Sequence, residues 1–174
     1  MSIRGIDFTT LSLMDALDLA ILVEAEAQER YQEFAEQMEQ HRTPEAASFF
    51  RHMAGNEAKH GQELTARRVQ RFQDAPRVVT PAMLFEVEAP DYDAARAFMS
   101  TRQAMEAALA SELKARRFFQ AALPALKDPE VHALFQELRD EEIEHQALVQ
   151  AQLDKLPPDR GDSDEAYVDE PAPQ

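Results

Sequence analysis

The chain has 174 residues, enough for one domain with a buried core, and a formal net charge of -15. This charge disfavours nucleic acid as a partner, because a protein that binds phosphates must bring cations to them. The sequence contains no Cys, which excludes iron–sulfur clusters and zinc–thiolate sites. It shows neither the layout of a signal peptide nor an apolar run of about 18 residues, so we expect a cytoplasmic protein with no membrane span.

The first predicted helix covers residues 12–40, after an irregular lead-in at residues 1–11. Ser12, followed by Asp15 three residues later, resembles a capping box. Positions that face the core then recur in steps of three and four, as is typical of an amphipathic helix. They are Leu17, Ala20, Glu24, Ala27, Tyr31, Phe34 and Met38. Glu24 lies in the middle of this apolar stripe, so we expect its carboxylate to be buried.

The second predicted helix covers residues 43–72, with Thr43 as its N-cap and Pro44 in its first turn. Its core-facing positions are Ala46, Phe50, Met53, Glu57, His60 and Leu64. Residues 73–99 contain three prolines and form too long a segment for a plain loop between packed helices. We expect a crossover there, with short helices near 81–87 and 92–99.

The third predicted helix begins near Ser100 and stops before Pro124, and the fourth covers residues 129–156 after the cap Asp128. Core-facing positions of the third are Met105, Ala108, Glu112, Ala115, Phe119 and Ala122. Those of the fourth are Val131, Phe135, Leu138, Glu142, His145, Val149 and Leu156. Residues 157–174 are acidic, with several prolines and almost nothing apolar, so we expect a flexible tail outside a folded domain at residues 1–156.

The second half of the sequence repeats the pattern of the first. A Glu-x-x-His motif recurs at an offset of 85 residues, and the Glu of the preceding helix recurs at an offset of 88 residues. The chain is therefore predicted to be an all-α four-helix bundle, made of two repeated helix pairs joined by a long crossover. The repeated polar residues are Glu24, Glu57 and His60 in the first half, and Glu112, Glu142 and His145 in the second.

These six side chains are predicted to bind two metal ions in the bundle core. Residues three apart on a helix share a face, so each Glu-x-x-His motif can present an oxygen and a nitrogen to one point. Burying an unpaired carboxylate costs roughly several kcal/mol, which four such residues could not bear without cations. Two divalent ions balance four carboxylates, and this set of oxygen and nitrogen ligands suits iron or manganese.

The remaining polar residues near the stripes are predicted to have other roles. The other histidines lie at a helix end or beside the stripes and are expected at the surface: His41, His52 and His132. Four off-stripe carboxylates are expected to be solvated: Glu26, Glu29, Glu106 and Glu141. Glu141 adjoins a predicted ligand, however, and can act around the metals. Tyr31 lies on the ligand face, as a core aromatic or as the donor of a hydrogen bond to a metal-bound carboxylate.

These motifs resemble those of the ferritin-like superfamily, and most of all its rubrerythrin-like branch. The resemblance covers the four helices. Its marks are the two Glu-x-x-His motifs, Glu24 with Tyr31 seven residues later, and Glu112 with Phe119 seven residues later. It implies a ferritin-like four-helix bundle with a di-iron centre, whose ligands would also be the catalytic residues through the metals. Glu24, Glu57 and His60 would serve one half, and Glu112, Glu142 and His145 the other, with Glu57 and Glu142 as bridges.

Some positions depart from the family pattern. Rubrerythrins carry a rubredoxin domain with Cys ligands, which this chain lacks, so its electron donor is unknown. Ala115 stands where rubrerythrins have an extra Glu, and Phe119 replaces a second Tyr. Ala58 stands where bacterioferritin has a haem-ligand Met, so no haem is expected.

The resemblance implies a di-iron carboxylate oxidoreductase that oxidises Fe(II) with O₂ or H₂O₂, or reduces peroxide, in iron handling and oxidative-stress defence. It also implies a homodimer or a larger homo-oligomer. Two alternatives stay open from the sequence. One is a non-catalytic module that binds or stores iron. The other is a di-iron oxygenase acting on an organic substrate, which would require an apolar pocket beside the metals.

Overall fold

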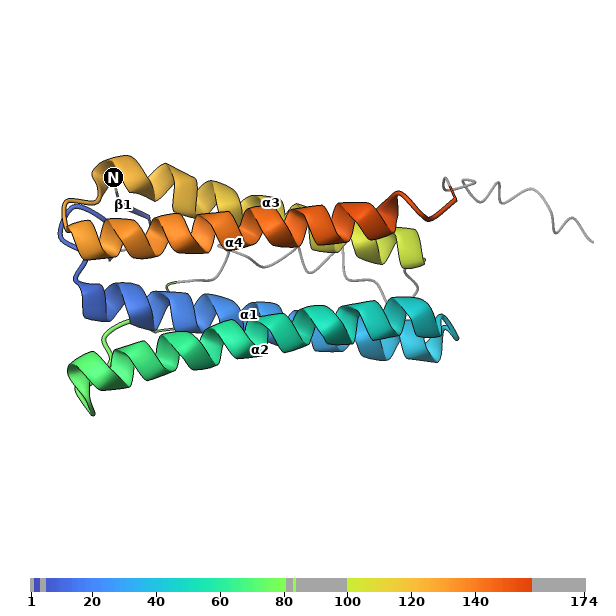
Figure 1. The fold of residues 1–174 in the computed structure, drawn as a ribbon, viewed down its shortest axis with the longest axis horizontal. Helices are drawn as coiled ribbons and strands as arrows, with labels where there is room; N and C mark the ends of the chain where they lie inside the picture. Colours follow the sequence, from blue (N-terminus) through green and yellow to red (C-terminus); the bar gives the residue numbers. More distant parts are fainter. Residues whose placement is uncertain (1, 4–5, 81–82, 84–99, 158–174) are drawn as a thin grey trace, which may run out of the picture.

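The computed structural model describes residues 2–3, 6–80, 83 and 100–157 of the chain. Its long helices are α1 (Leu13–Gln40), α2 (Pro44–Phe72), α3 (Thr101–Ala122) and α4 (Pro129–Leu153). They run alongside one another in two pairs (Figure 1), with α1 packed mainly against α2 and α3 mainly against α4. A 3₁₀ turn at Leu123–Ala125 follows α3. The predicted all-α four-helix bundle is confirmed.

Three helices begin where the sequence predicts, and each has a capping side chain there. The Ser12 side chain accepts a hydrogen bond from the backbone N–H of Asp15. Ser100 forms a complete capping box with Gln103, and Asp128 accepts hydrogen bonds from two N–H groups of the next turn. Caps of this kind are worth about 1 kcal/mol each, because they satisfy donors that a helix leaves unpaired.

The turn between α1 and α2 differs from the prediction. Thr43 occupies the N-cap position of α2, but its side chain makes no capping hydrogen bond. Its hydroxyl donates instead to the Met38 carbonyl at 2.8 Å. Arg42 in the same turn has a φ of 58°, a value that is uncommon for residues other than Gly. Thr43 therefore closes the end of α1 rather than capping the start of α2.

The last helix is shorter than predicted, since α4 ends at Leu153 and not at residue 156. The guanidinium of Arg102, on α3, lies at this end. It donates hydrogen bonds to the carbonyls of Leu153, Leu156 and Pro157 at 3.3, 2.6 and 2.8 Å. A cation here satisfies carbonyls that the helix terminus leaves unpaired. The chain therefore leaves the helix early while it stays attached to α3.

Two clusters of buried apolar side chains fill the bundle. One includes Leu17, Phe119 and Phe135, and the other includes Phe34 and Phe50. Burying a side chain of this size contributes roughly 1.5–3 kcal/mol. On each helix the predicted ligands fall between residues of the two clusters. A polar layer therefore crosses the middle of an otherwise apolar core.

The segment before α1 is not the irregular lead-in that the sequence predicts. Strands β1 (Ser2–Ile3) and β2 (Ile6–Asp7) form an antiparallel pair. Phe8 follows them and is buried, with its ring centroid 5.7 Å from that of Phe118 and 6.1 Å from that of Phe135. These edge-to-face contacts tie the segment to α3 and α4. Strands of two residues are too short to show the alternation on which a sequence prediction rests.

A buried ion pair holds the start of the crossover. Arg68 Nε and Nη2 lie 2.9 and 3.3 Å from the two carboxylate oxygens of Asp18, which is fully buried. Arg68 also donates to the carbonyls of Gln73 and Ala75 at 2.7 and 2.6 Å. This guanidinium therefore fixes the path of the chain as it leaves α2. The predicted short helices near 81–87 and 92–99, and the predicted tail, lie outside the described residues apart from Met83 and Pro157.

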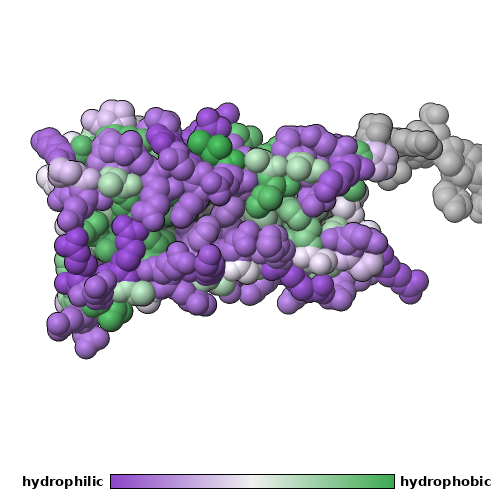
Figure 2. All heavy atoms as spheres, viewed as in Figure 1, coloured by the Kyte–Doolittle hydropathy of each residue, from purple (hydrophilic) through white to green (hydrophobic). Residues whose placement is uncertain are grey.

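The visible face of the molecule is mostly hydrophilic, with small apolar patches between the polar side chains (Figure 2). Exposed large apolar residues include Val69, Val78, Ile143 and Leu148. Single exposed apolar side chains of this kind are ordinary in folded proteins. Within the described residues, no helix is both long and apolar enough to cross a membrane.

Candidate metal centre

The polar layer contains all six predicted ligands, and each of the four helices contributes to it. α1 supplies Glu24, α2 supplies Glu57 and His60, α3 supplies Glu112, and α4 supplies Glu142 and His145. The four carboxylates and His145 are at most 5% exposed, while the His60 side chain is 20% exposed. Their burial follows from the helical period, which places each one on the stripe that faces the core.

The ligand atoms meet in three overlapping groups. In each group the oxygens and nitrogens all lie within 4.8 Å of one another. Glu57, His60 and His145 form the first group, Glu112, Glu142 and His145 the second, and Glu24, His60 and Glu141 the third. The structure thus brings all six predicted residues together, and it adds Glu141 to them.

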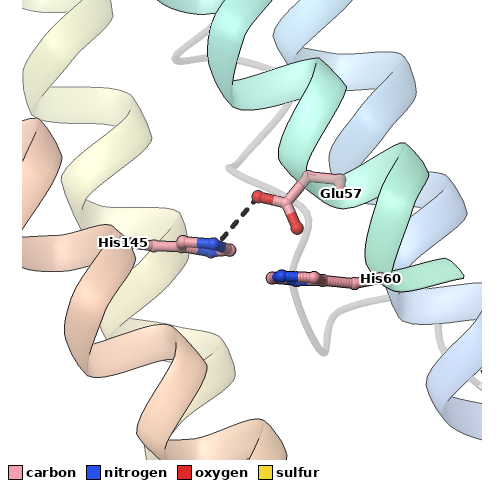
Figure 3. A group of neighbouring side chains, drawn as sticks. All are labelled: Glu57, His60 and His145. Carbon is pink, nitrogen blue, oxygen red and sulfur yellow. Dashed lines mark ion pairs between the residues drawn. The ribbon is translucent and has the colours of Figure 1, made fainter. Parts of the chain in front are cut away.

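The two imidazoles face each other across the bundle (Figure 3). Their ring centroids are 5.4 Å apart and their planes differ by 6°. His145 Nδ1 lies 3.2 Å from Glu57 Oε1 and 3.5 Å from Glu112 Oε2. On the other side, His60 Nδ1 lies 3.8 Å from Glu24 Oε2 and 4.0 Å from Glu141 Oε2, and it has no hydrogen-bond partner in the described part of the chain.

These separations fit metal coordination. Bonds from a metal ion to nitrogen or oxygen are about 2 Å long, so two ligands of one ion lie up to about 4 Å apart. The four distances above, from 3.2 to 4.0 Å, fall within this limit. Carboxylates and imidazoles in a helical bundle form the donor set of a pair of iron or manganese ions.

Comparison with known proteins identifies the family. The family model for the ferritin-like domain matches residues 10–158. The chain belongs to the ferritin-like family. It is also similar to a solved structure, that of an uncharacterised conserved protein from Magnetospirillum magnetotacticum MS-1. The two are 29% identical, with a TM-score of 0.70, over 84% of this chain and 97% of that one. A search of curated proteins gave no match.

The electrostatics of this ferritin-like layer show the cost of its carboxylates. Burial raises the pKa of Glu24 to about 7, although a hydrogen bond with Glu57 acts in the opposite direction. Burial lowers the pKa of His60, and the neighbouring His145 adds to that effect. Burial also acts to lower the pKa of His145, but the hydrogen bond and charge of Glu112 outweigh it and the pKa is raised. Burial thus disfavours the charged forms of Glu24 and His60, and a cation would relieve this cost for the carboxylate.

Two residues around the ligands secure the α3 side of the site. The buried Tyr31 hydroxyl, from α1, donates a hydrogen bond to Glu112 Oε1. The Gln146 side chain donates to the Glu112 carbonyl at 3.1 Å and accepts from Arg116 at 3.2 Å. Phe119, which matches Tyr31 in the repeat, packs against Phe135 instead. Sequence reasoning included Tyr31 but missed Gln146, because the apolar periodicity does not report a polar residue at a helix–helix contact.

The off-stripe residues divide into two kinds. His41, His52, Glu29 and Glu106 are exposed as predicted, whereas Glu26 and His132 are half-buried. Glu141 is only partly solvated, with a side chain that is 31% exposed, and it lies beside His60, as the alternative that it acts around the metals requires. Glu141 is four residues before His145, a spacing that places both on one helical face. That spacing is the signal that could have found it.

Proposed function

We propose that this ferritin-like chain is a di-iron carboxylate oxidoreductase that acts on iron and reactive oxygen. The meeting of six ligand side chains from four helices in one buried layer supports this proposal. Two divalent cations would balance the charges of the four buried carboxylates. When bound, two Fe(II) ions would supply the electrons that reduce O₂ or H₂O₂; two Mn(II) ions suit the same donor set.

The residues of the layer would divide the binding between the two helix pairs. Glu24 and His60 would hold one ion, and Glu112 and His145 the other. Glu57 is grouped with both imidazoles, as a bridging carboxylate requires. Glu142 is grouped with Glu112 and His145, and would help to hold the ion on that side. The apolar clusters on either side of the layer would keep bulk water away from these ligands.

Glu24 would exchange a proton for a metal ion. Because its pKa is raised to about 7, this carboxyl is partly protonated at neutral pH. A cation favours the ionised form, so binding would release the proton. The ligand set would therefore bind metal more tightly as the pH rises through that range.

A groove on α1 and α2 would give small molecules access to the site. Its volume is about 560 Å³, and Glu57 lies among its lining residues. Small residues form part of its wall, including Ala25, Ala58 and Gly61. A molecule the size of O₂ or H₂O₂, or an Fe(II) ion, would reach Glu57 from this side.

Anaerobic titration of the purified full chain with Fe(II), followed by metal analysis, tests the proposal. We expect about two Fe(II) ions per chain. Adding O₂ or H₂O₂ should then oxidise the bound Fe(II) faster than free Fe(II) in the same buffer. A Glu57→Ala/His60→Ala variant is the matched control, because it lacks ligands but keeps the apolar clusters.

The other outcomes separate the alternatives. No bound iron would contradict a metal centre altogether. Accumulation of iron far beyond two ions per chain would favour storage. Two bound ions that oxidise no faster than free Fe(II), but react when an organic substrate is added, would favour an oxygenase.

A further inference from the structure

The two helix pairs differ at one position beside the candidate metal centre. In α4, Glu141 immediately precedes the ligand Glu142. In α2, the residue that precedes Glu57 is Asn56, at the same offset of 85 residues that relates the two motifs. The second pair thus has a carboxylate that the first pair lacks.

This additional carboxylate reaches across to the opposite helix pair. Glu141 lies on α4, but its Oε2 is 4.0 Å from Nδ1 of His60 on α2. Glu141, His60 and Glu24 form a group whose ligand atoms all lie within 4.8 Å of one another. The Glu141 side chain is 31% exposed, and Glu24 is 4% exposed. The group therefore extends from the buried carboxylate of Glu24 to the partly exposed carboxylate of Glu141.

Among the described residues, no Lys or Arg side chain pairs with Glu141 to explain why its carboxylate lies here. In the described part of the chain, Glu141 forms no ion pair with a Lys or Arg, and its one ion-pair partner is His60. Three further carboxylates, Glu137, Glu63 and Glu144, repel its charge, whereas His145 attracts it. A half-buried carboxylate among like charges is unfavourable unless a cation joins it. The Glu24–His60 side is where such a cation would lie.

We propose that Glu141 is a further metal ligand, a fifth carboxylate that binds the ion held by Glu24 and His60. The inference rests on the proposed di-metal function and extends it. The two ions then have unequal ligand sets, because the Glu112–His145 side has no counterpart to Glu141. The additional negative charge favours a trivalent over a divalent ion on the Glu24–His60 side.

Anaerobic Mn(II) titration by calorimetry, with electron paramagnetic resonance to count free Mn(II), tests this assignment. The full chain is compared with Glu141→Gln, which keeps the shape and removes the charge. Glu29→Gln is the matched control, since Glu29 is an exposed carboxylate on α1 outside the ligand groups. We expect the parent and the control to bind two ions. Glu141→Gln should weaken one of the two by about 10-fold or more and leave the other unchanged.

A second readout locates the weakened site. Mössbauer spectra of the Fe(II)-loaded parent should show two unequal iron environments, of which Glu141→Gln alters one. If the parent binds two ions and Glu141→Gln gives the same titration and spectra, the inference about Glu141 is overturned but the proposed function is not. Loss of both ions would overturn the assignment to one side. A parent that binds no Mn(II) or Fe(II) would overturn the proposed function as well.

Discussion

The α1–α2 and α3–α4 pairs each present two Glu and one His as candidate ligands, but they hold them differently. Around Glu112 the site is preformed: Tyr31 donates to the carboxylate and Gln146 binds the backbone carbonyl. His145 Nδ1 lies 3.5 Å from Glu112 Oε2, and 3.2 Å from Glu57 Oε1 of the other pair. Around Glu24 the site is looser, because His60 Nδ1 is 3.8 and 4.0 Å from its nearest carboxylates.

Exposure follows the same division. The His60 side chain is 20% exposed and the His145 side chain 6%. The groove that Glu57 lines also lies on the α1–α2 pair. Preorganised ligands bind with less loss of conformational freedom. The comparison therefore indicates one enclosed position on the Glu112 side and one more open position on the Glu24 side.

Removing Glu57 or Glu142 should have the largest effect on this pair of sites. Glu57 contacts the ligand groups of both sides, whereas Glu142 is grouped with Glu112 and His145 alone. Glu57→Ala should therefore reduce the bound metal from about two ions to none, and Glu142→Ala from about two to one. Metal analysis after anaerobic Fe(II) loading measures this.

The controls for these variants are Glu29→Ala and Glu106→Ala, which remove exposed carboxylates from α1 and α3. Both should still bind about two ions. If Glu57→Ala and Glu142→Ala lose the same number of ions, the two sides do not bind their ions independently. If all four variants bind like the parent, the ligand assignment is wrong.

Metal binding should also stabilise the fold in two unequal steps. A ligand that binds only the native state at 100 times its Kd adds about 2.7 kcal/mol to the free energy of unfolding. The enclosed Glu112–His145 side should bind first and tightest, so the first equivalent of Mn(II) should raise the Tm more than the second. Calorimetric melting of the chelator-treated protein, titrated with Mn(II), measures both steps. Identical melting curves with and without metal would contradict a buried site.

The pH dependence should reverse between the metal-free and the metal-loaded protein. The pKa of Glu24 rises from 4.5 to about 7 on folding, so the native state binds this proton more tightly than the unfolded state. The stability contributed by the protonated carboxyl is therefore present below about pH 4.5 and lost as the pH rises to about 7. For Glu24 alone the loss is on the order of 1–3 kcal/mol. With metal bound, stability should increase over the same range, because the ions compete with protons.

Urea unfolding between pH 4.5 and 8 measures this reversal. Glu24→Gln is the informative variant, because it removes the titrating group and keeps a similar shape. Its metal-free form should lose less stability than the parent as the pH rises. A parent and variant with the same pH profile would show that Glu24 does not carry the effect.

Sequence periodicity located the helices and the ligands because both depend on which face of a helix is buried. Glu24 could be placed in the core from the residues on either side of it in the apolar stripe. Periodicity does not identify the neighbour on another helix. It therefore missed the pairing of Asp18 with Arg68, the support of Glu112 by Gln146, and the approach of Glu141 to His60.

Local capping chemistry shows the same limit. Ser12, Ser100 and Asp128 cap their helices as their sequence neighbours indicate. Thr43 has the residue type and position of a cap, but the adjoining turn brings the Met38 carbonyl within reach of its hydroxyl. The end of α4 likewise depends on Arg102, which is far away in the sequence. Contacts between distant segments decide these details, and no local pattern reports them.

The smallest predicted effect concerns Tyr31, whose hydroxyl supports only the Glu112 side. Tyr31→Phe removes that hydrogen bond and leaves the ring, which packs against Phe50 with centroids 6.0 Å apart. The variant should therefore fold, while the two sides become more alike. Loss of a residue that orients a metal ligand typically costs 10- to 100-fold in affinity or activity. We expect about 10-fold, because Gln146 and His145 still hold Glu112. Stopped-flow oxidation of Fe(II) and titration with Mn(II), in parent and variant, measure this loss. If Tyr31→Phe instead weakens the Glu24–His60 side and leaves the Glu112 side intact, the hydrogen bond is not what distinguishes the two sides.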